Sequence, residues 1–262
     1  MQHLDVRIHD HVATVLIDRP EKHGALSPGL LFDLNEALGD VHQEKKVRAV
    51  ILSSRGDHFC SGVDLQVFQQ IADLPESERM QQWFEYWRAV SETCEKMLRF
   101  PKPIIAAVDG AAIGAGFALM LAADLSVASK RATFAADAAR RGLVGGVTTA
   151  LLSFRVGASA AARLTLAGET IDAEEARRLN LLCQGPVASD QVWVVANEWA
   201  KRCSEGPAEA VQASKRLLNE SVGEALLTQI SAAAADSASA CTTESAAEGI
   251  SAFLEKRKPS WP

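Results

Sequence analysis

The 262-residue sequence predicts an α/β fold with a helical C-terminal region. Over the first 140 residues, short apolar stretches typical of strands alternate with longer stretches of helical spacing. Beyond residue 140 the character changes, and nearly everything from 190 to 258 has helical spacing. Strands that alternate with helices, followed by helices alone, indicate an α/β domain that ends in helices.

The N-terminal third supplies the first strands and helices. Residues 12–18 alternate like a strand, and residues 47–53 form a short apolar run typical of a buried strand. Residues 28–42 have helical spacing, with four leucines on one face. A long helix is expected over 73–100, opened by Pro75 near its first turn.

The middle of the chain continues the alternation. Residues 102–110 predict a third apolar strand, 114–124 a third helix, and 125–129 and 132–136 two more short strands. Farther on, the run from Ala232 to Ala247 is rich in small residues. We interpret this run as helices that pack closely on a neighbour, and a subunit interface would suit it.

Composition and charge exclude several classes of protein. A net charge of −6 argues against general nucleic-acid binding, and no apolar run is long enough to cross a membrane. The N-terminal residues predict a strand rather than a secretion signal. The five cysteines are scattered, with no CxxC or CxxH cluster, so we expect reduced thiols, a cytoplasmic location and no metal site.

The stretch GAAIGAGFALMLAAD (110–124) is a glycine-rich turn between a strand and a helix, with no charged residue before Asp124. One interpretation is a dinucleotide site, where backbone approaches a pyrophosphate at a helix N-terminus. Such a fingerprint should follow the first strand, whereas this turn follows the third. The lysine that should come four residues after the tyrosine is also missing, because the only tyrosine, Tyr86, has Val90 there.

A second interpretation is an oxyanion hole, in which two backbone amides hold a developing negative oxygen and no reactive side chain is needed. Small residues then let a carbonyl group touch the backbone. The second amide must come from another loop, and FCSGVDL (59–65) is the candidate. This loop also follows a buried strand and carries a glycine before a helix start.

Five motifs, collinear over almost the whole chain, resemble those of the enoyl-CoA hydratase/isomerase (crotonase) superfamily. They are LIDRPEKHGALS, HFCSGVDL, PKPIIAAVDGAAIGAGFALMLAADLSVAS, LTLAGETIDAEEARRLNLL and EGISAFLEKRKPSW. The resemblance implies a crotonase (ClpP-like) fold of repeated ββα units. It divides the chain into a core that binds acyl-CoA (1–195) and a C-terminal helical oligomerisation region (196–262). It also implies a homotrimer or a dimer of trimers.

The resemblance implies an acyl-CoA thioester as the ligand, with coenzyme A as part of the substrate and no separate cofactor. Lyase or isomerase chemistry in fatty acid metabolism is typical of the family. Val63 and Ala115 match the two residues whose amides stabilise an enolate oxygen. The residues matched to substrate binding are Lys22, His23, Ala25, Ser61, Gly62, Asp64, Gly114, Gly116, Phe253 and Lys256.

The sequence departs from the family at the two glutamates that hydratases carry. Ala118 and Ala138 stand at those positions, and glycines stand at 145 and 146, where some related isomerases and a dehalogenase place a carboxylate. Asp137 lies next to one of the vacant positions. It is either a displaced catalytic base or the N-cap of the next helix.

Two functions therefore stay open. One is an enzyme of enolate chemistry, such as an isomerase, and the other is a non-catalytic acyl-CoA-binding protein. Structural roles are expected for several side chains near the motifs: a helix cap for Asp64, a small buried thiol for Cys60, a solvated loop position for His58, a surface position for Glu85, and core or pocket lining for Trp83, Phe84 and Trp87. Arg140 and Arg141 face either solvent or a carboxylate on the substrate.

Overall fold

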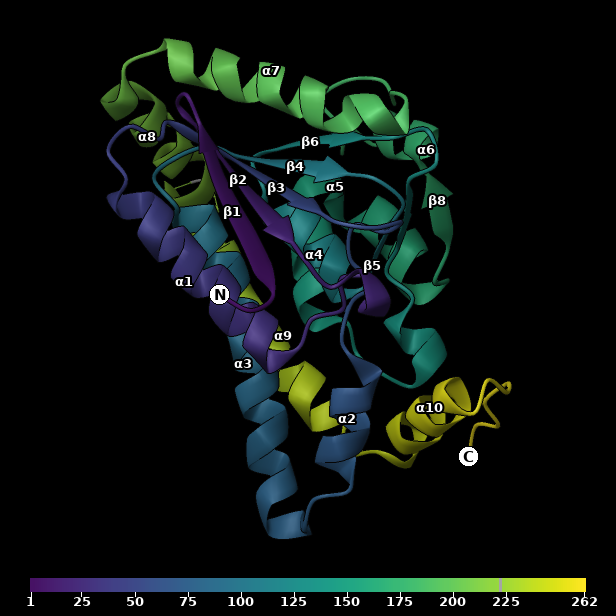
Figure 1. Ribbon diagram of the computed structural model, residues 1–262. Helices are drawn as coiled ribbons and strands as arrows, with labels where there is room; N and C mark the ends of the chain where they lie inside the picture. Colours follow the sequence, from purple (N-terminus) through teal and green to yellow (C-terminus); the bar gives the residue numbers. More distant parts are fainter. Residues whose placement is uncertain (222) are drawn as a thin grey trace.

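The computed structural model describes residues 1–221 and 223–262 and confirms the α/β architecture with its helical C-terminal region (Figure 1). The larger sheet has the strand order β1-β2-β3-β4-β6, and the smaller has the order β5-β7-β8. β1 pairs antiparallel with β2, and β8 pairs antiparallel with β7, whereas the other pairs are parallel. The strands are β1 (Leu4–His9), β2 (Val12–Ile17), β3 (Ala49–Ser54), β4 (Ile104–Val108), β5 (Ala111–Ile113), β6 (Leu125–Ala128), β7 (Thr133–Ala135) and β8 (Thr170–Asp172).

Helices cover both sheets and make up most of the chain after residue 140. The α-helices are α1 (Pro28–Gln43), α2 (Leu65–Ala72), α3 (Glu76–Arg99), α4 (Ala115–Ala122), α5 (Gly146–Leu166), α6 (Ala173–Arg178), α7 (Val192–Glu205), α8 (Ala208–Arg216), α9 (Glu224–Ala240) and α10 (Glu244–Leu254). Short 3₁₀ turns lie at Pro20–Lys22 (η1), Ala138–Arg141 (η2) and Ser189–Gln191 (η3), and a π-helical turn at Leu217–Ser221 (η4). The predicted helical stretch 190–258 includes Val222, which lies outside the described residues. None of these described helices has the length and apolarity needed to cross a bilayer.

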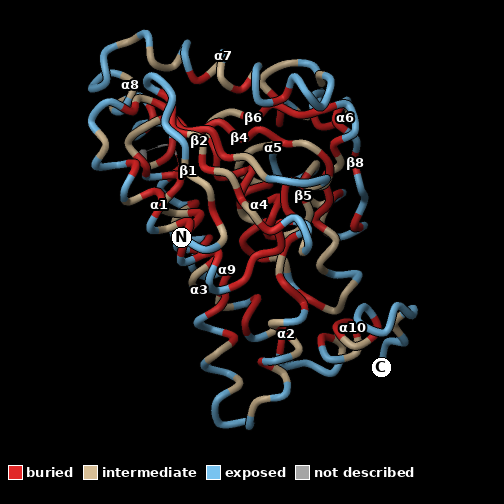
Figure 2. Tube along the Cα trace, in the orientation of Figure 1, coloured by how far each residue is buried: buried red, intermediate tan, exposed pale blue. Residues whose placement is uncertain are grey.

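The larger sheet is buried on both faces, as parallel strands require. Ala49 and Ile51 of β3 pack with Ala196 of α7, which lies along one face of the sheet (Figure 1). Val50 and Leu52 belong to the main core cluster with α1, α3 and α4 on the other face. Successive residues of β3 therefore serve opposite faces, and the strands and α4 form the buried centre of the molecule (Figure 2).

Several sequence predictions differ from the structure. β5 and β8 were not predicted, because each has only three residues and forms through pairing with β7, a contact that the local sequence pattern does not show. Phe84 was placed in the core or pocket, but its side chain is exposed on the outer face of α3, whereas Trp83 is fully buried. The boundary predicted between 195 and 196 falls inside α7.

The small-residue run 232–247 lies mostly in α9, which packs between α3 and α5 of the same chain. A Cβ on Gly146 of α5 would lie 2.2 Å from the carbonyl oxygen of Ala233. The Gly146 N–H donates to Ser237 Oγ at 3.0 Å. Close packing within one subunit therefore explains the small residues, and the predicted subunit interface remains a prediction.

Asp124, at the end of α4, anchors a buried polar cluster. Lys215 Nζ donates to Asp124 Oδ2 at 2.7 Å and to the carbonyl oxygens of Met97 and Lys102, each at 3.1 Å. The Ile104 N–H donates to the same carboxylate oxygen at 2.7 Å. Burial lowers the pKa of Lys215. The cluster ties α8 to the start of β4, so it fixes the segment that leads into the glycine turn.

Replacing Lys215 with Met should destabilise the protein by about 3 kcal/mol, because the largely buried Asp124 carboxylate loses its cation. The measurement is urea unfolding at neutral pH. Lys201→Met, at an exposed position of α7, is the control and should change stability by less than about 0.5 kcal/mol. Equal unfolding midpoints for Lys215→Met and the wild type would show that the cluster contributes nothing.

Candidate functional site

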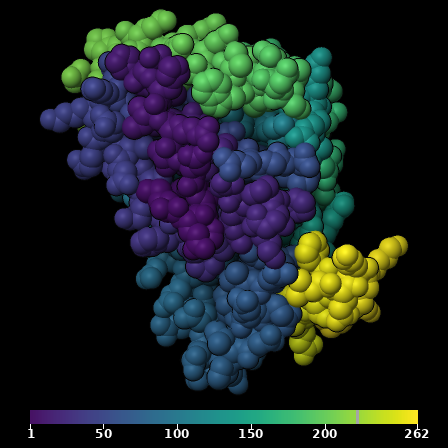
Figure 3. Space-filling view, in the orientation of Figure 1, coloured from purple at the N-terminus to yellow at the C-terminus, as the bar shows by residue number. Residues whose placement is uncertain are grey.

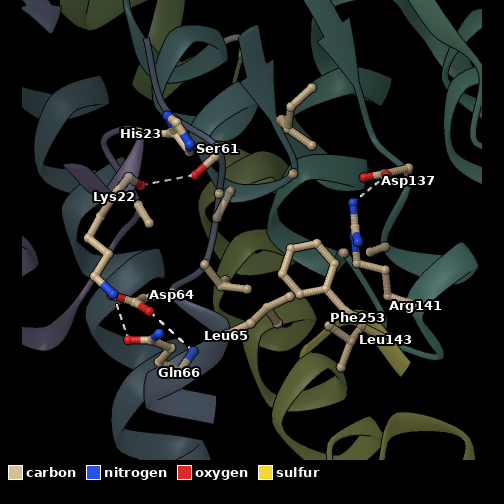
Figure 4. A pocket seen from close by; sticks show the side chains of 18 of the residues that line it. Lys22, His23, Ser61, Asp64, Leu65, Gln66, Asp137, Arg141, Leu143 and Phe253 are labelled. Carbon is tan, nitrogen blue, oxygen red and sulfur yellow. Dashed lines mark hydrogen bonds and ion pairs between the residues drawn. The ribbon is translucent and has the colours of Figure 1, made fainter. Parts of the chain in front are cut away.

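A cavity of about 380 Å³ lies where the loops after β2 and β3, the glycine turn and the C-terminal helix meet (Figure 4). Residues 21–25 and 61–66 form one side, and the turn 113–115 forms the floor. Residues 137–148, which include η2 and the start of α5, form the opposite wall together with the end of α10. Five segments far apart in the sequence therefore build one site.

The loop after β3 and the segment before α4 are held together by backbone hydrogen bonds. The Cys60 N–H donates to the Ala111 oxygen at 3.0 Å, and the Ile113 N–H donates to the Cys60 oxygen at 2.9 Å. On its other side the loop pairs with Leu26, whose N–H donates to the Gly62 oxygen at 2.8 Å. The loop thus makes one parallel β-bridge to Leu26 through Val63 and another to Ala112 through Cys60.

Glycines make this close approach sterically possible. A Cβ on Gly116 would lie 2.3 Å from the Cys60 oxygen, and one on Gly62 would lie 2.8 Å from the Ile113 oxygen. Gly114 has open space around it, but its φ of +52° and ψ of −121° favour glycine. Two glycines therefore leave room for contact, and the third sets the direction of the turn.

Two backbone amides in this region stand without an acceptor. Val63 and Ala115 both line the cavity, and neither N–H donates to any group in residues 1–221 or 223–262. Ala115 is the first residue of α4, where the amide has no intrahelical acceptor and the helix dipole is positive. A Cβ on Gly62 would lie 3.6 Å from Ala115 N, so the loops are adjacent. Such a pair can hold an oxygen that carries negative charge.

Asp64 has a structural role, as the sequence predicted. Its carboxylate caps α2 by accepting from the Gln66 N–H at 3.2 Å. It also accepts from Arg19 Nη2 at 3.1 Å, and Arg19 reaches the Ala25 oxygen with its other terminal nitrogen. With both side chains about nine-tenths buried, this ion pair holds residues 19–25 against the loop rather than presenting a reactive group.

Asp137 lines the cavity and occupies the N-cap position of η2, as one interpretation predicted, but its side chain makes no capping hydrogen bond. The carboxylate pairs with Arg141, whose Nη2 donates to Asp137 Oδ2 at 3.2 Å (Figure 4). The Arg141 guanidinium in turn lies 4.7 Å from the centre of the Phe253 ring. Ala138 lines the cavity beside this pair, whereas Ala118 is fully buried in α4.

The other matched residues divide between the cavity and its surroundings. Lys22, His23, Ala25, Ser61, Gly62, Gly114 and Phe253 line the cavity. Gly116 lies behind it, against Cys60, and Lys256 is exposed beyond the end of α10. The structure therefore brings together most of the residues that the motifs single out.

The side chains of Cys60 and His58 also lie at the loop after β3. Cys60 is fully buried, and burial raises the pKa of its thiol to about 12, which agrees with the structural role predicted for it. His58 was predicted as a solvated loop residue, but it is partly buried and accepts from the Ala111 N–H at 3.3 Å. Burial, followed by the nearby His23, lowers the pKa of His58.

Sequence reasoning missed several residues of the cavity. Thr148 of α5 donates its hydroxyl to the Gly114 oxygen at 3.0 Å, and Leu65, Leu143 and Leu254 add apolar wall. No local pattern marks these positions, because they reach the cavity only through tertiary packing. Within the described chain, no group of three His, Cys, Asp or Glu side chains is arranged to hold a metal ion.

Comparison with known proteins agrees with the sequence resemblance. The family model described as enoyl-CoA hydratase/isomerase matches residues 7–262. A relative from Thermus thermophilus whose name places it among the enoyl-CoA hydratases is 32% identical over 252 residues, with 95% of this chain and 96% of that protein covered. The crystal structure of an enoyl-CoA hydratase from Mycobacterium avium has a TM-score of 0.85 at 29% identity, with 99% of both chains covered. An enoyl-CoA hydratase/isomerase from Pseudoalteromonas atlantica gives a TM-score of 0.83 at 30% identity over 99% of this chain and all of that one.

Gly116→Ala should destabilise the protein by about 2 kcal/mol, because the new Cβ meets the Cys60 backbone and must push the loop away. Alanine has the higher helix propensity, so propensity alone predicts the opposite sign. Gly185→Ala, where a Cβ would meet nothing within 4 Å, is the control. Thermal unfolding of both variants gives the answer, and an unchanged or raised Tm for Gly116→Ala would disprove the close approach.

Proposed function

The chain belongs to the enoyl-CoA hydratase/isomerase family, and from that premise we propose that it binds an acyl-CoA thioester in the cavity. The observation that supports this most directly is the pair of cavity-lining amides, Val63 and Ala115, which donate to no group in the described chain. The thioester carbonyl oxygen would accept from both, so that the two residues form an oxyanion hole.

Such a hole would act on the charge that develops during reaction. When the bond between Cα and the carbonyl carbon gains double-bond character, the thioester oxygen becomes an enolate oxygen. Two fixed amides, one at the positive end of α4, stabilise that oxygen more than the neutral carbonyl. Loss of one such donor typically slows a reaction by about 10²- to 10³-fold.

Proton transfer suits the remaining side chains better than addition of water. Hydration needs an acid and a base, and alanines stand at 118 and 138, where the family's hydratases carry glutamates. Asp137 is a carboxylate on the wall beside Ala138. As a base it would take a proton from one acyl carbon, the electron pair would pass to the thioester oxygen, and the proton would return at another carbon.

The coenzyme A moiety would occupy the end of the cavity formed by Lys22, His23, Ala25 and Ser61, with no separate cofactor. Lys256 follows α10 closely and would offer a point charge to a phosphate. A trimer or a dimer of trimers, and a cytoplasmic location with reduced thiols, complete the proposal.

A second candidate function is acyl-CoA binding without catalysis. One observation favours it: the Asp137 carboxylate is already engaged by Arg141 at 3.2 Å, so that it is not free to approach an acyl carbon. The two candidates share the binding site and differ only in turnover.

The wild-type protein should bind butyryl-CoA yet hydrate crotonyl-CoA extremely slowly. Each positioned acid or base contributes roughly 10²- to 10⁴-fold, so the absence of both should reduce hydration by about 10⁴-fold or more relative to hydratases that have them. Calorimetric titration reports binding, and loss of the enoyl absorbance reports hydration. Rapid hydration would mean that an ionisable group other than the usual pair performs the chemistry.

If the protein isomerises enoyl-CoA substrates, Asp137→Asn should abolish that activity and leave butyryl-CoA binding unchanged, because the amide cannot accept the proton. Glu85→Gln, at an exposed position of α3, is the matched control and should keep full activity. A panel of positional enoyl-CoA isomers, followed by chromatography, measures the turnover. Undiminished isomerisation by Asp137→Asn would exclude Asp137 as the base, and turnover of no isomer by the wild type would favour the binding protein.

A further inference from the structure

Arg141 is a cation on the wall of the cavity that faces away from the coenzyme A end. In Figure 4 it lies on the opposite side of the cavity from Lys22, beside Asp137 and Phe253. An unsubstituted acyl chain needs no cation there, because apolar groups alone satisfy it. The position of Arg141 therefore calls for an explanation beyond the proposed reaction.

Most N–H groups of the Arg141 guanidinium have no acceptor in the described chain. It carries five N–H groups, and within the described chain only Nη2 donates, to Asp137 Oδ2 at 3.2 Å. The contact involves one nitrogen and one oxygen, so it is not the two-bond fork that arginine and carboxylate can form. The side chain is 32% exposed and lines the cavity. Nη1 thus has no partner in the described chain and is available to a ligand.

The guanidinium is also held in place. Its Cζ lies 4.7 Å from the centre of the Phe253 ring, and this cation–π contact holds the guanidinium against the ring. Its backbone is clamped by α10, since a Cβ on Gly249 would lie 1.9 Å from the Arg141 oxygen. A donor group that is fixed before binding loses little conformational entropy when a ligand arrives.

The wall that carries Arg141 is joined to the glycine turn by direct contacts. Thr148 Oγ1 donates to the Gly114 oxygen at 3.0 Å, and Thr148 lies one helical turn from Gly145. A Cβ on Gly145 would lie 3.1 Å from the Ala138 Cβ, and Ala138 opens η2, which ends at Arg141. An acyl chain whose carbonyl lies at the two amides, with coenzyme A at the Lys22 end, would therefore extend toward this wall.

We propose that Arg141 selects acyl-CoA thioesters whose acyl chain ends in a carboxylate. The proposal rests on acyl-CoA binding in this cavity and adds the chemical class of the acyl group. The terminal carboxylate accepts from Nη1 of Arg141, which donates to no group in the described chain. Asp137, on the other side of the guanidinium, repels the same carboxylate and so limits its affinity.

The test compares glutaryl-CoA with pentanoyl-CoA, which have acyl chains of five carbons and differ in the terminal carboxylate. Calorimetric titration of the full-length protein should show tighter binding of glutaryl-CoA. In Arg141→Met the affinity for glutaryl-CoA should fall about tenfold, the size expected for one charge-assisted interaction at a partly exposed site, while that for pentanoyl-CoA stays within about twofold. Arg141→Lys should recover only part of the loss.

Two further variants separate recognition from folding. Arg140→Met removes the neighbouring exposed cation, which contacts the Ala167 oxygen, and should leave both affinities unchanged. Asp137→Asn removes the competing carboxylate and should tighten glutaryl-CoA binding severalfold without affecting pentanoyl-CoA. Opposite signs for the variants at 137 and 141 are expected only if the pair acts on the ligand's charge, since loss of a purely structural ion pair would weaken both ligands together.

Each outcome decides between the two proposals. Binding of both thioesters by the wild type with no preference for glutaryl-CoA, or an equal loss of both in Arg141→Met, would overturn the role of Arg141 and leave acyl-CoA binding intact. Binding of neither thioester would overturn acyl-CoA binding itself. If Arg141→Met does not fold, the wild-type preference and the Asp137→Asn result decide the question.

Discussion

The backbone contact between residues 59–64 and 111–116 is the constraint on which the rest of the site depends. Two loops follow buried parallel strands and touch through the Cys60–Ala111 and Ile113–Cys60 hydrogen bonds, with no side chain between them. Because backbone groups bond so closely here, glycine is required at 62 and 116. The same geometry leaves two neighbouring amides, at 63 and 115, on the cavity surface. The groups that these two loops offer to a ligand are therefore backbone amides rather than side chains.

This constraint explains why the reactive-looking side chains nearby are inert. Cys60 contributes its backbone to the bridge and buries its thiol, and Asp64 joins the cap of α2 to Arg19. Both residues keep the loop in position, although Asp64 also lines the cavity. The charged pair that does line the cavity, Asp137 with Arg141, comes from a different segment. The backbone contact and the charged pair therefore belong to separate parts of the chain.

The sequence predicted the main strands, the helices and the two glycine loops, because these depend on local periodicity and on backbone conformations that only glycine adopts easily. It did not predict β5 and β8, whose three residues exist only through pairing with β7. Phe84 was placed in the core or pocket and His58 in solvent, and both were wrong, while the side-chain partner of Asp137 was not foreseen. Their surroundings are set by remote or tertiary partners, such as Arg141 for Asp137 and the Ala111 amide for His58.

The C-terminal helix, α10, forms part of the cavity wall of its own chain through Phe253 and Leu254. α10 lies beside α2 and η2 at one corner of the molecule, close to the chain end (Figures 1 and 3). Its glycine at 249 lets it approach the Arg141 backbone, and its Phe253 supports the Arg141 guanidinium. A displacement of α10 would therefore change both the apolar wall and the position of the cation. The shape and the charge of this wall are thus coupled through one helix, and under the proposal for Arg141 a ligand that engages it would also stabilise the packing of α10 on the core.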